Sequence, residues 1–81
     1  MIHNLKIADL EFKGRGELIN GVITYSCGEY VGNIHHANLL KKMTGNVKVE
    51  YSDEYQNHSH DIAIENIRVI PERWGRIVVK I

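Results

Sequence analysis

The stretch that decides the fold is Asn46–Ile70, NVKVEYSDEYQNHSHDIAIENIRVI. It begins with alternating apolar and polar side chains, the pattern of a half-buried strand, with the apolar ones at Val47, Val49 and Tyr51. The polar segment 52–60 follows and predicts a loop, because it is rich in Asp, Asn and Ser. A second apolar run starting at Asp61 predicts the returning strand, so the stretch as a whole predicts a β-hairpin.

The returning strand changes its alternation at Glu65-Asn66. This change predicts a bulge or one tight helical turn within the segment IENIR. Pro71 lacks an amide hydrogen and should end the strand. After it, the apolar run Ile77–Ile81 predicts a last strand, which could lie in the centre of a sheet or pair with another subunit.

The first half of the chain predicts further strands. Leu5–Phe12 carries apolar residues of both parities, which suggests one strand, either with a bulge near Ala8-Asp9 or buried on both faces. A short helix is the alternative, because Leu5, Ala8 and Phe12 also fit helical spacing. The two glycines of KGRG (13–16) predict a turn or a sharp kink. Asn20-Gly21, between two β-rich runs, predicts a type I′ hairpin, because both central residues of that turn need positive φ.

A helix is predicted at residues 33–44, with Asn33 as N-cap and Gly45 after its end. Together the elements predict an α+β domain spanning residues 1–81. We expect a small, mainly antiparallel sheet of about five strands and one helix, in the order ββ(β)-α-βββ.

The strand with Val47, Val49, Tyr51 and Asp53 and the later segment Asn66–Arg68 resemble the last part of small SH3-like barrels of the Tudor and KOW kind. The resemblance covers roughly a third of the chain. It implies an alternative fold, an SH3-like small barrel with an inserted helix. It also implies a binding module whose ligands range from proteins to nucleic acid, and it implies no chemistry.

Composition limits the possible functions. The 10 basic and 10 acidic side chains cancel, which disfavours a general polyanion binder and leaves little repulsion against self-association. Cys27 is the single cysteine, so the chain has no internal disulfide, and no apolar run is long enough to span a membrane. We therefore expect a cytoplasmic protein without a membrane partner, and a homo-oligomer, in the first instance a dimer.

Two groups of residues are candidates for a site. The histidines offer a divalent-metal site, because imidazole and carboxylate groups are ligands for zinc or nickel; its candidate ligands are His58, His60, Asp61, His35 and His36. The second group joins cationic side chains to the only tryptophan, a combination that suits a protein interface or phosphate binding with base stacking; it comprises Arg68, Arg73, Trp74 and Arg76, together with Lys80.

No catalytic motif is present, so the sequence favours a non-enzymatic module that acts through protein–protein interaction, such as an accessory or inhibitor protein, and that carries no cofactor. One alternative is a nucleotide, small-ligand or nucleic-acid binder at a subunit interface. Another is a metal-dependent hydrolase that uses the histidines.

Overall fold

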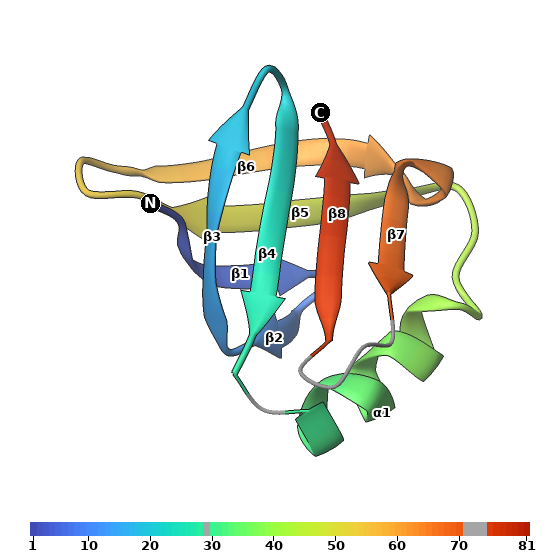
Figure 1. The fold of residues 1–81 in the computed structure, drawn as a ribbon. Coiled ribbons are helices and arrows are strands. Elements are labelled where there is room, and N and C mark those ends of the chain that lie inside the picture. Colours follow the sequence, from blue (N-terminus) through green and yellow to red (C-terminus); the bar gives the residue numbers. More distant parts are fainter. Residues whose placement is uncertain (29, 71–74) are drawn as a thin grey trace.

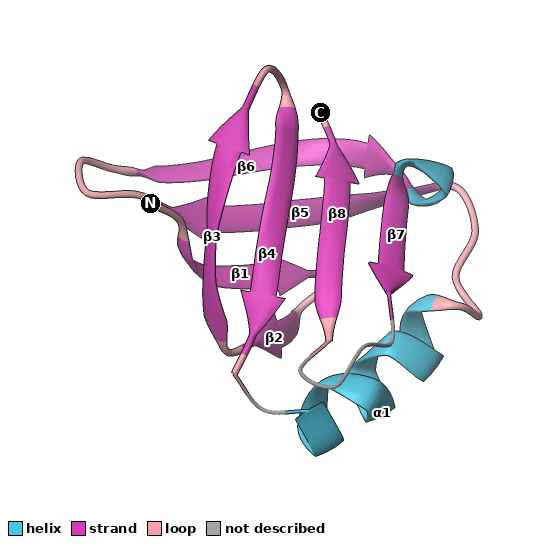
Figure 2. Cartoon of the chain, viewed as in Figure 1, coloured by secondary structure: helices cyan, strands magenta, loops and turns pink. Residues whose placement is uncertain are grey.

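The computed structural model describes residues 1–28, 30–70 and 75–81, and of residues 30–34 only the backbone. The described chain is mainly β (Figures 1 and 2). One antiparallel sheet has the order β2 (Leu10–Phe12), β1 (His3–Ile7), β5 (Asn46–Ser52), β6 (Asn57–Ala63), and we call it the first sheet. The other, the second sheet, has the order β3 (Gly14–Ile19), β4 (Val22–Cys27), β8 (Arg76–Lys80), β7 (Ile67–Ile70).

The second sheet packs across the first, and helix α1 (Tyr30–Leu40) lies beyond one end of it (Figure 1). The two sheets meet at one corner, where Ile2 and Gly16 exchange backbone hydrogen bonds of 2.7 and 3.0 Å. The prediction of an α+β fold with one five-stranded sheet is therefore wrong. So is the alternative of an SH3-like barrel, because the described strands form two separate four-stranded sheets and no closed barrel.

Two local features set the course of the chain, one within the first sheet and one between the sheets. Ala8 and Asp9 both adopt positive φ, 50° and 67°, and form a tight turn, so the predicted single bulged strand is a hairpin of β1 and β2. The predicted helical turn at IENIR is confirmed as a 3-10 helix, η1 (Ile64–Asn66). It carries the chain out of the first sheet and into β7 of the second (Figure 1).

The chain also changes sheet between β2 and β3, where the sequence predicted a turn or a kink. Only Lys13 separates the two strands, so the segment bends instead of turning back. At Gly16 a Cβ atom would lie 2.3 Å from the carbonyl oxygen of Thr24. This close approach of two backbones allows only glycine, which is a known use of glycine at sheet corners.

The hairpin of β5 and β6 is confirmed, but its loop is shorter than predicted. The strands pair from Asn46 opposite Ala63 to Ser52 opposite Asn57, so only residues 53–56 form the loop. His58 and His60 therefore belong to a strand. The Asn20-Gly21 hairpin is confirmed as well, with φ of 52° and 76°.

Helix α1 begins three residues before the predicted start and ends four residues before the predicted end. It ends at Leu40 because the next turn tightens: the amides of Lys42 and Met43 donate to carbonyls three residues earlier, Leu39 and Leu40. Gly45 adopts the positive φ expected of a glycine after a helix, 78°, five residues further on.

The core lies between the sheets and draws on both. Its fully buried side chains come from β1, β2 and β5 on one side and from β4 and β8 on the other: Leu5, Ile7, Phe12, Val49, Ile23, Tyr25, Ile77 and Val79. The Tyr25 hydroxyl donates a 2.7 Å hydrogen bond to the carbonyl of Phe12 and so links the sheets. Strand β8 is central, between β4 and β7 of the same chain.

Candidate functional site

Two of the candidate arginines lie on one surface, the outer face of the second sheet. Arg68 is directly opposite Val78, and Arg76 is directly opposite Ile70 in the β7–β8 ladder. Because residues two apart share a face of a strand, Arg68 and Arg76 are diagonal neighbours on the side away from the core. Arg73 and Trp74 lie outside the described residues.

The same face carries Lys80 of the predicted group and one further cation, Arg15, that the sequence did not single out. Arg15 is opposite Ser26, which is opposite Arg76, so the two arginines stand in one row two strands apart, about 10 Å. Lys80 is opposite Val22 at the other end of β8. Arg15, Arg68, Arg76 and Lys80 are all exposed. We call this surface the basic face.

Small side chains separate these cations, and one acidic side chain accompanies them. Thr24 and Ser26 of β4 and Val78 of β8 occupy the centre of the face. Glu17, opposite Thr24, is the one carboxylate on the described part of the face. Four cations and one carboxylate give the described part of the face a net charge of 4 − 1 = +3.

The opposite surface has the opposite charge. The outer face of the first sheet carries Lys6 and Lys48, paired with Glu11, Glu50 and Asp61, a net charge of 2 − 3 = −1. The two hairpin turns of that sheet add Asp9, Asp53 and Glu54. Positive and negative charges are therefore concentrated on different faces, although the chain as a whole has no net charge.

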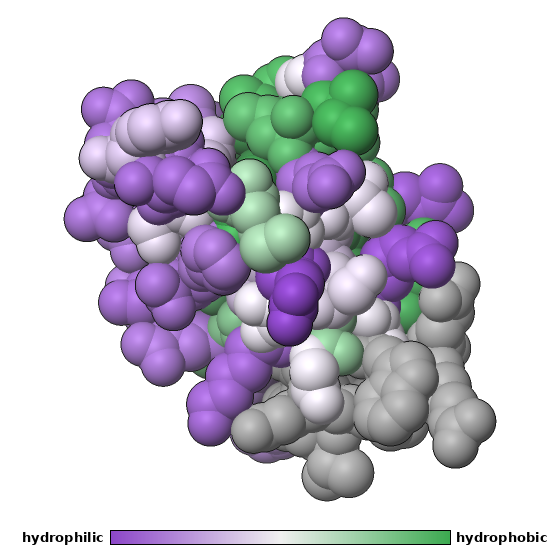
Figure 3. All heavy atoms as spheres, turned by 60° about the vertical axis from the view of Figure 1, so that its left-hand side comes forward, coloured by the Kyte–Doolittle hydropathy of each residue, from purple (hydrophilic) through white to green (hydrophobic). Residues whose placement is uncertain are grey.

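Apolar side chains gather at one end of the second sheet. Leu18 and Ile19, just before the β3–β4 turn, are 45% and 61% exposed. Ile81 is 42% exposed and lies beside that turn, because its amide donates a 2.8 Å bond to the carbonyl of Gly21. Figure 3 shows this apolar patch above more hydrophilic side chains. A hollow of about 480 Å³ on the β3–β4 part of the basic face includes Met1, Ile19 and Arg15 in its lining.

The histidines of β6 lie around Tyr51, on the face of the first sheet that turns toward the core. The His58 ring stacks on Tyr51 with centroids 4.9 Å apart, and the His60 ring lies 5.7 Å from it. The Tyr51 hydroxyl is 3.1 Å from Nε2 of His60. Both histidines are half-buried, so they cover the edge of the core at β6.

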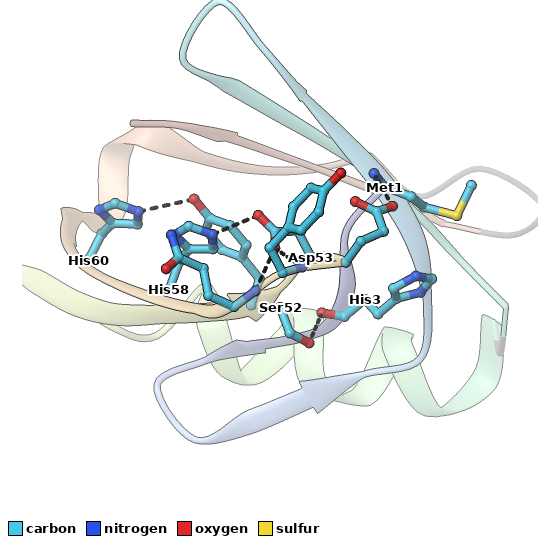
Figure 4. A network of polar contacts seen from close by, with 10 residues as sticks. Met1, His3, Ser52, Asp53, His58 and His60 are labelled. Carbon is cyan, nitrogen blue, oxygen red and sulfur yellow. Dashed lines mark hydrogen bonds and ion pairs between the residues drawn. The ribbon is translucent and has the colours of Figure 1, made fainter.

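Asp53 joins this cluster through the β5–β6 loop. Its Oδ1 accepts hydrogen bonds of 2.8 Å from the amides of Gln56 and Tyr55, and its Oδ2 lies 2.8 Å from Nε2 of His58 (Figure 4). These bonds, led by the one from Gln56, lower the pKa of Asp53 from 3.8 to about 2. The carboxylate thus stabilises the β5–β6 turn, and both of its oxygens have hydrogen-bond partners.

The remaining metal candidates lie elsewhere. Nδ1 of His36 is 2.8 Å from the carbonyl of Glu11, and its ring packs edge-on against Phe12, so this histidine attaches α1 to β2. His35 is exposed on α1, and Asp61 lies on the outer face of the first sheet, opposite Lys48. Among the described residues, no three His, Cys, Asp or Glu side chains come together as a metal site.

Cys27 is a core residue. Its side chain is 3% exposed, and burial raises the pKa of the thiol from 9.0 to about 11. The thiol is therefore protonated at neutral pH, whereas cysteine nucleophiles react as thiolates.

Comparison of the chain with protein-family models, with curated proteins and with solved structures finds no match. Within the described ranges, no helix has the length and apolar character needed to cross a membrane.

The sequence contained a signal for Arg15, the cation that the predicted group lacked. The Asn20-Gly21 turn fixes the register of β3 and β4, and that register alone places Arg15 beside Ser26 on the face away from the core. That Arg15 shares a face with Arg68 and Lys80 depends on the pairing of β4 with β8, 50 or more residues along the chain. No local pattern reveals that pairing.

Proposed function

We propose that the protein is a non-enzymatic module that binds single-stranded nucleic acid on the outer face of the second sheet. The observation that carries the proposal is the basic face, where β3, β8 and β7 supply Arg15, Arg76, Lys80 and Arg68 to one surface. Phosphate contacts by Arg and Lys supply most of the affinity of proteins that bind nucleic acid without sequence preference.

The shape of the face favours a single strand over a duplex. Four strands about 4.8 Å apart span about 14 Å, whereas the major groove of B-DNA is about 12 Å wide and admits a helix or a two-stranded ribbon. A flexible single strand can follow the surface of a sheet of this width. The small side chains Thr24, Ser26 and Val78 leave its centre open to such a strand.

The number of cations sets the expected dependence on salt. If the four cations each contact one phosphate, log K should fall with log salt at a slope of about −0.7 × 4, or about −2.8. Affinity should then drop about 50-fold between 50 and 200 mM salt. The described part of the face has no aromatic side chain, so we expect little discrimination between sequences.

A cytoplasmic location forms part of this proposal, and the buried free thiol of Cys27 is consistent with it. The protein partner expected from the sequence stays a prediction. Because an acidic protein surface would meet the same cations, the experiment must distinguish the two partners.

The test is fluorescence anisotropy of a labelled 20-nucleotide single strand, as DNA and as RNA, titrated with the full chain at several salt concentrations. The informative variant is Arg15→Gln, Arg68→Gln, Lys80→Gln, which removes three cations from exposed positions on the basic face. Its matched control is Lys6→Gln, Lys42→Gln, Lys48→Gln, which changes the net charge equally but alters the first sheet and the turn after α1.

We expect the control to keep the steep dependence of log K on log salt. In the variant the slope should fall to about −0.7, which corresponds to about a threefold loss of affinity between 50 and 200 mM salt. The proposal fails if the wild type does not bind at 50 mM salt, or if the two triple variants bind alike. Poly-glutamate is the competitor. If it displaces the strand as well as an unlabelled strand of equal charge does, the assignment to nucleic acid fails in favour of an acidic protein.

A further inference from the structure

An apolar groove lies between α1 and β7, apart from the basic face. It has a volume of about 260 Å³ and is lined by the end of α1, the turn after it, η1 and β7. Its lining includes Leu40, Met43, Ile64, Ile67 and Val69, with Lys41 as its one charged side chain. The volume lies below the range of about 300–1,000 Å³ typical of small-molecule sites, so the groove suits one or two side chains.

The groove runs beside the edge of a sheet. Strand β7 pairs with β8 on one side, and no described strand pairs with its other side. Ile67 and Val69 lie opposite the buried residues Val79 and Ile77, so they point inward from this edge. The edge therefore combines unpaired backbone hydrogen-bonding groups with an apolar surface next to them.

The other three edges of the sheets lack this combination. Strand β2 has three residues, and Ile2 already bonds the backbone of β3 at Gly16. Strand β6 presents His58 and His60 on its inner face and Asp61 on its outer face, and polar side chains discourage pairing at an edge. The edge of β7 is thus the one best suited to accept another strand.

We propose that the edge of β7 binds an extended segment of a partner protein, which adds to the second sheet as a fifth strand. Backbone hydrogen bonds to β7 hold the segment, and small apolar side chains at alternate positions enter the groove. Lys41 in the lining and the exposed Lys42 next to it in the chain outnumber the exposed Glu65 of η1 and give this edge a positive charge. The segment should therefore carry acidic residues beside its apolar ones.

This site is separate from the basic face, since Ile67 and Val69 point inward from β7 whereas Arg68 points outward. The two surfaces would let one molecule hold a nucleic acid and a protein together. Neither surface requires the other, so each can be tested by itself.

The experiment is a selection of phage-displayed ten-residue peptides on the full chain. We expect enriched peptides with small apolar residues at alternate positions and Asp or Glu at one end. When a selected peptide is added, exchange of the backbone amides of Ile67–Ile70 should slow, and the largest NMR shift changes should fall on β7 and residues 37–43. A copy of the peptide with N-methylated backbone amides should not bind.

The matched protein variants are Lys41→Glu and Lys48→Glu, both at exposed positions. Lys41→Glu should weaken the selected peptide about three- to fivefold, and Lys48→Glu on the first sheet should leave its affinity unchanged. The proposal is overturned if no peptide is enriched, if the shift changes map to another surface, or if the N-methylated peptide binds as well as its parent. Amide exchange needs no variant, so the test does not depend on how a substitution folds.

Discussion

Replacing Tyr25 by phenylalanine should destabilise the protein by about 1–3 kcal/mol. Tyr25 is completely buried, and its hydroxyl donates a 2.7 Å bond to the carbonyl of Phe12 in the opposite sheet. Burial is also the main reason why the pKa of this phenol is raised, with a smaller opposing contribution from the Leu5 backbone. Phenylalanine fills nearly the same space, so the change removes the bond and leaves the partner carbonyl without its donor.

The effect should be large relative to the whole stability. A chain of 81 residues has a free energy of unfolding of about 4–12 kcal/mol. Because about 1 kcal/mol corresponds to about 4–8 °C in a domain of this size, a loss near 2 kcal/mol should lower Tm by about 8–16 °C. Thermal and urea unfolding followed by circular dichroism would measure it, and the urea slope should not change.

Tyr51→Phe is the matched control. Its hydroxyl bonds to Nε2 of the half-buried His60 at 3.1 Å, where water can replace the lost partner, so its cost should stay below about 1 kcal/mol. The reasoning is refuted if Tyr25→Phe unfolds within about 2 °C of the wild type, or if Tyr51→Phe costs as much.

Three further predictions follow from particular contacts. Gly16→Ala should lower the free energy of unfolding, measured in urea, by about 1–3 kcal/mol, because the added Cβ would lie 2.3 Å from the carbonyl oxygen of Thr24. Gly28→Ala should be almost neutral, because the atom nearest to its added Cβ lies 3.9 Å away. Equal losses in the two variants would show that the corner at Gly16 is not tight. The lowered pKa of Asp53 contributes stability that is present above about pH 4 and lost as pH falls through about 2, so the Tm difference between wild type and Asp53→Asn should shrink over that interval; a constant difference would contradict it. If the expected dimer forms through the apolar patch, Ile19→Lys should shift sedimentation to the monomer, and an unchanged dimer would place the contact elsewhere.

The candidate site was only partly accessible to sequence reasoning. The sequence identified Arg68, Arg76 and Lys80 because they stand near a tryptophan, but it grouped them by their proximity in the chain. The structure groups them by sheet register and adds Arg15. For the histidines, the structure removes a predicted site. They looked like a polar loop with metal ligands, yet strand pairing extends to Asn57 and turns His58 and His60 toward Tyr51.

The sequence by itself determined the features that depend on local geometry. Asn20-Gly21 dictates its hairpin because these residues accept positive φ at little cost, and the alternation at Val47–Tyr51 dictates a strand with one buried face. The change of alternation at IENIR likewise marked the 3-10 turn.

Only the tertiary structure decided how the strands divide between two sheets. Ala8 adopts positive φ, which alanine rarely does, and its amide donates a hydrogen bond to the carbonyl of Lys48 in β5, 40 residues away. The pairing of β4 with β8 is equally distant in sequence, and it creates the basic face. Such contacts depend on which apolar surfaces bury each other best, and this is a property of the whole chain that no short pattern contains.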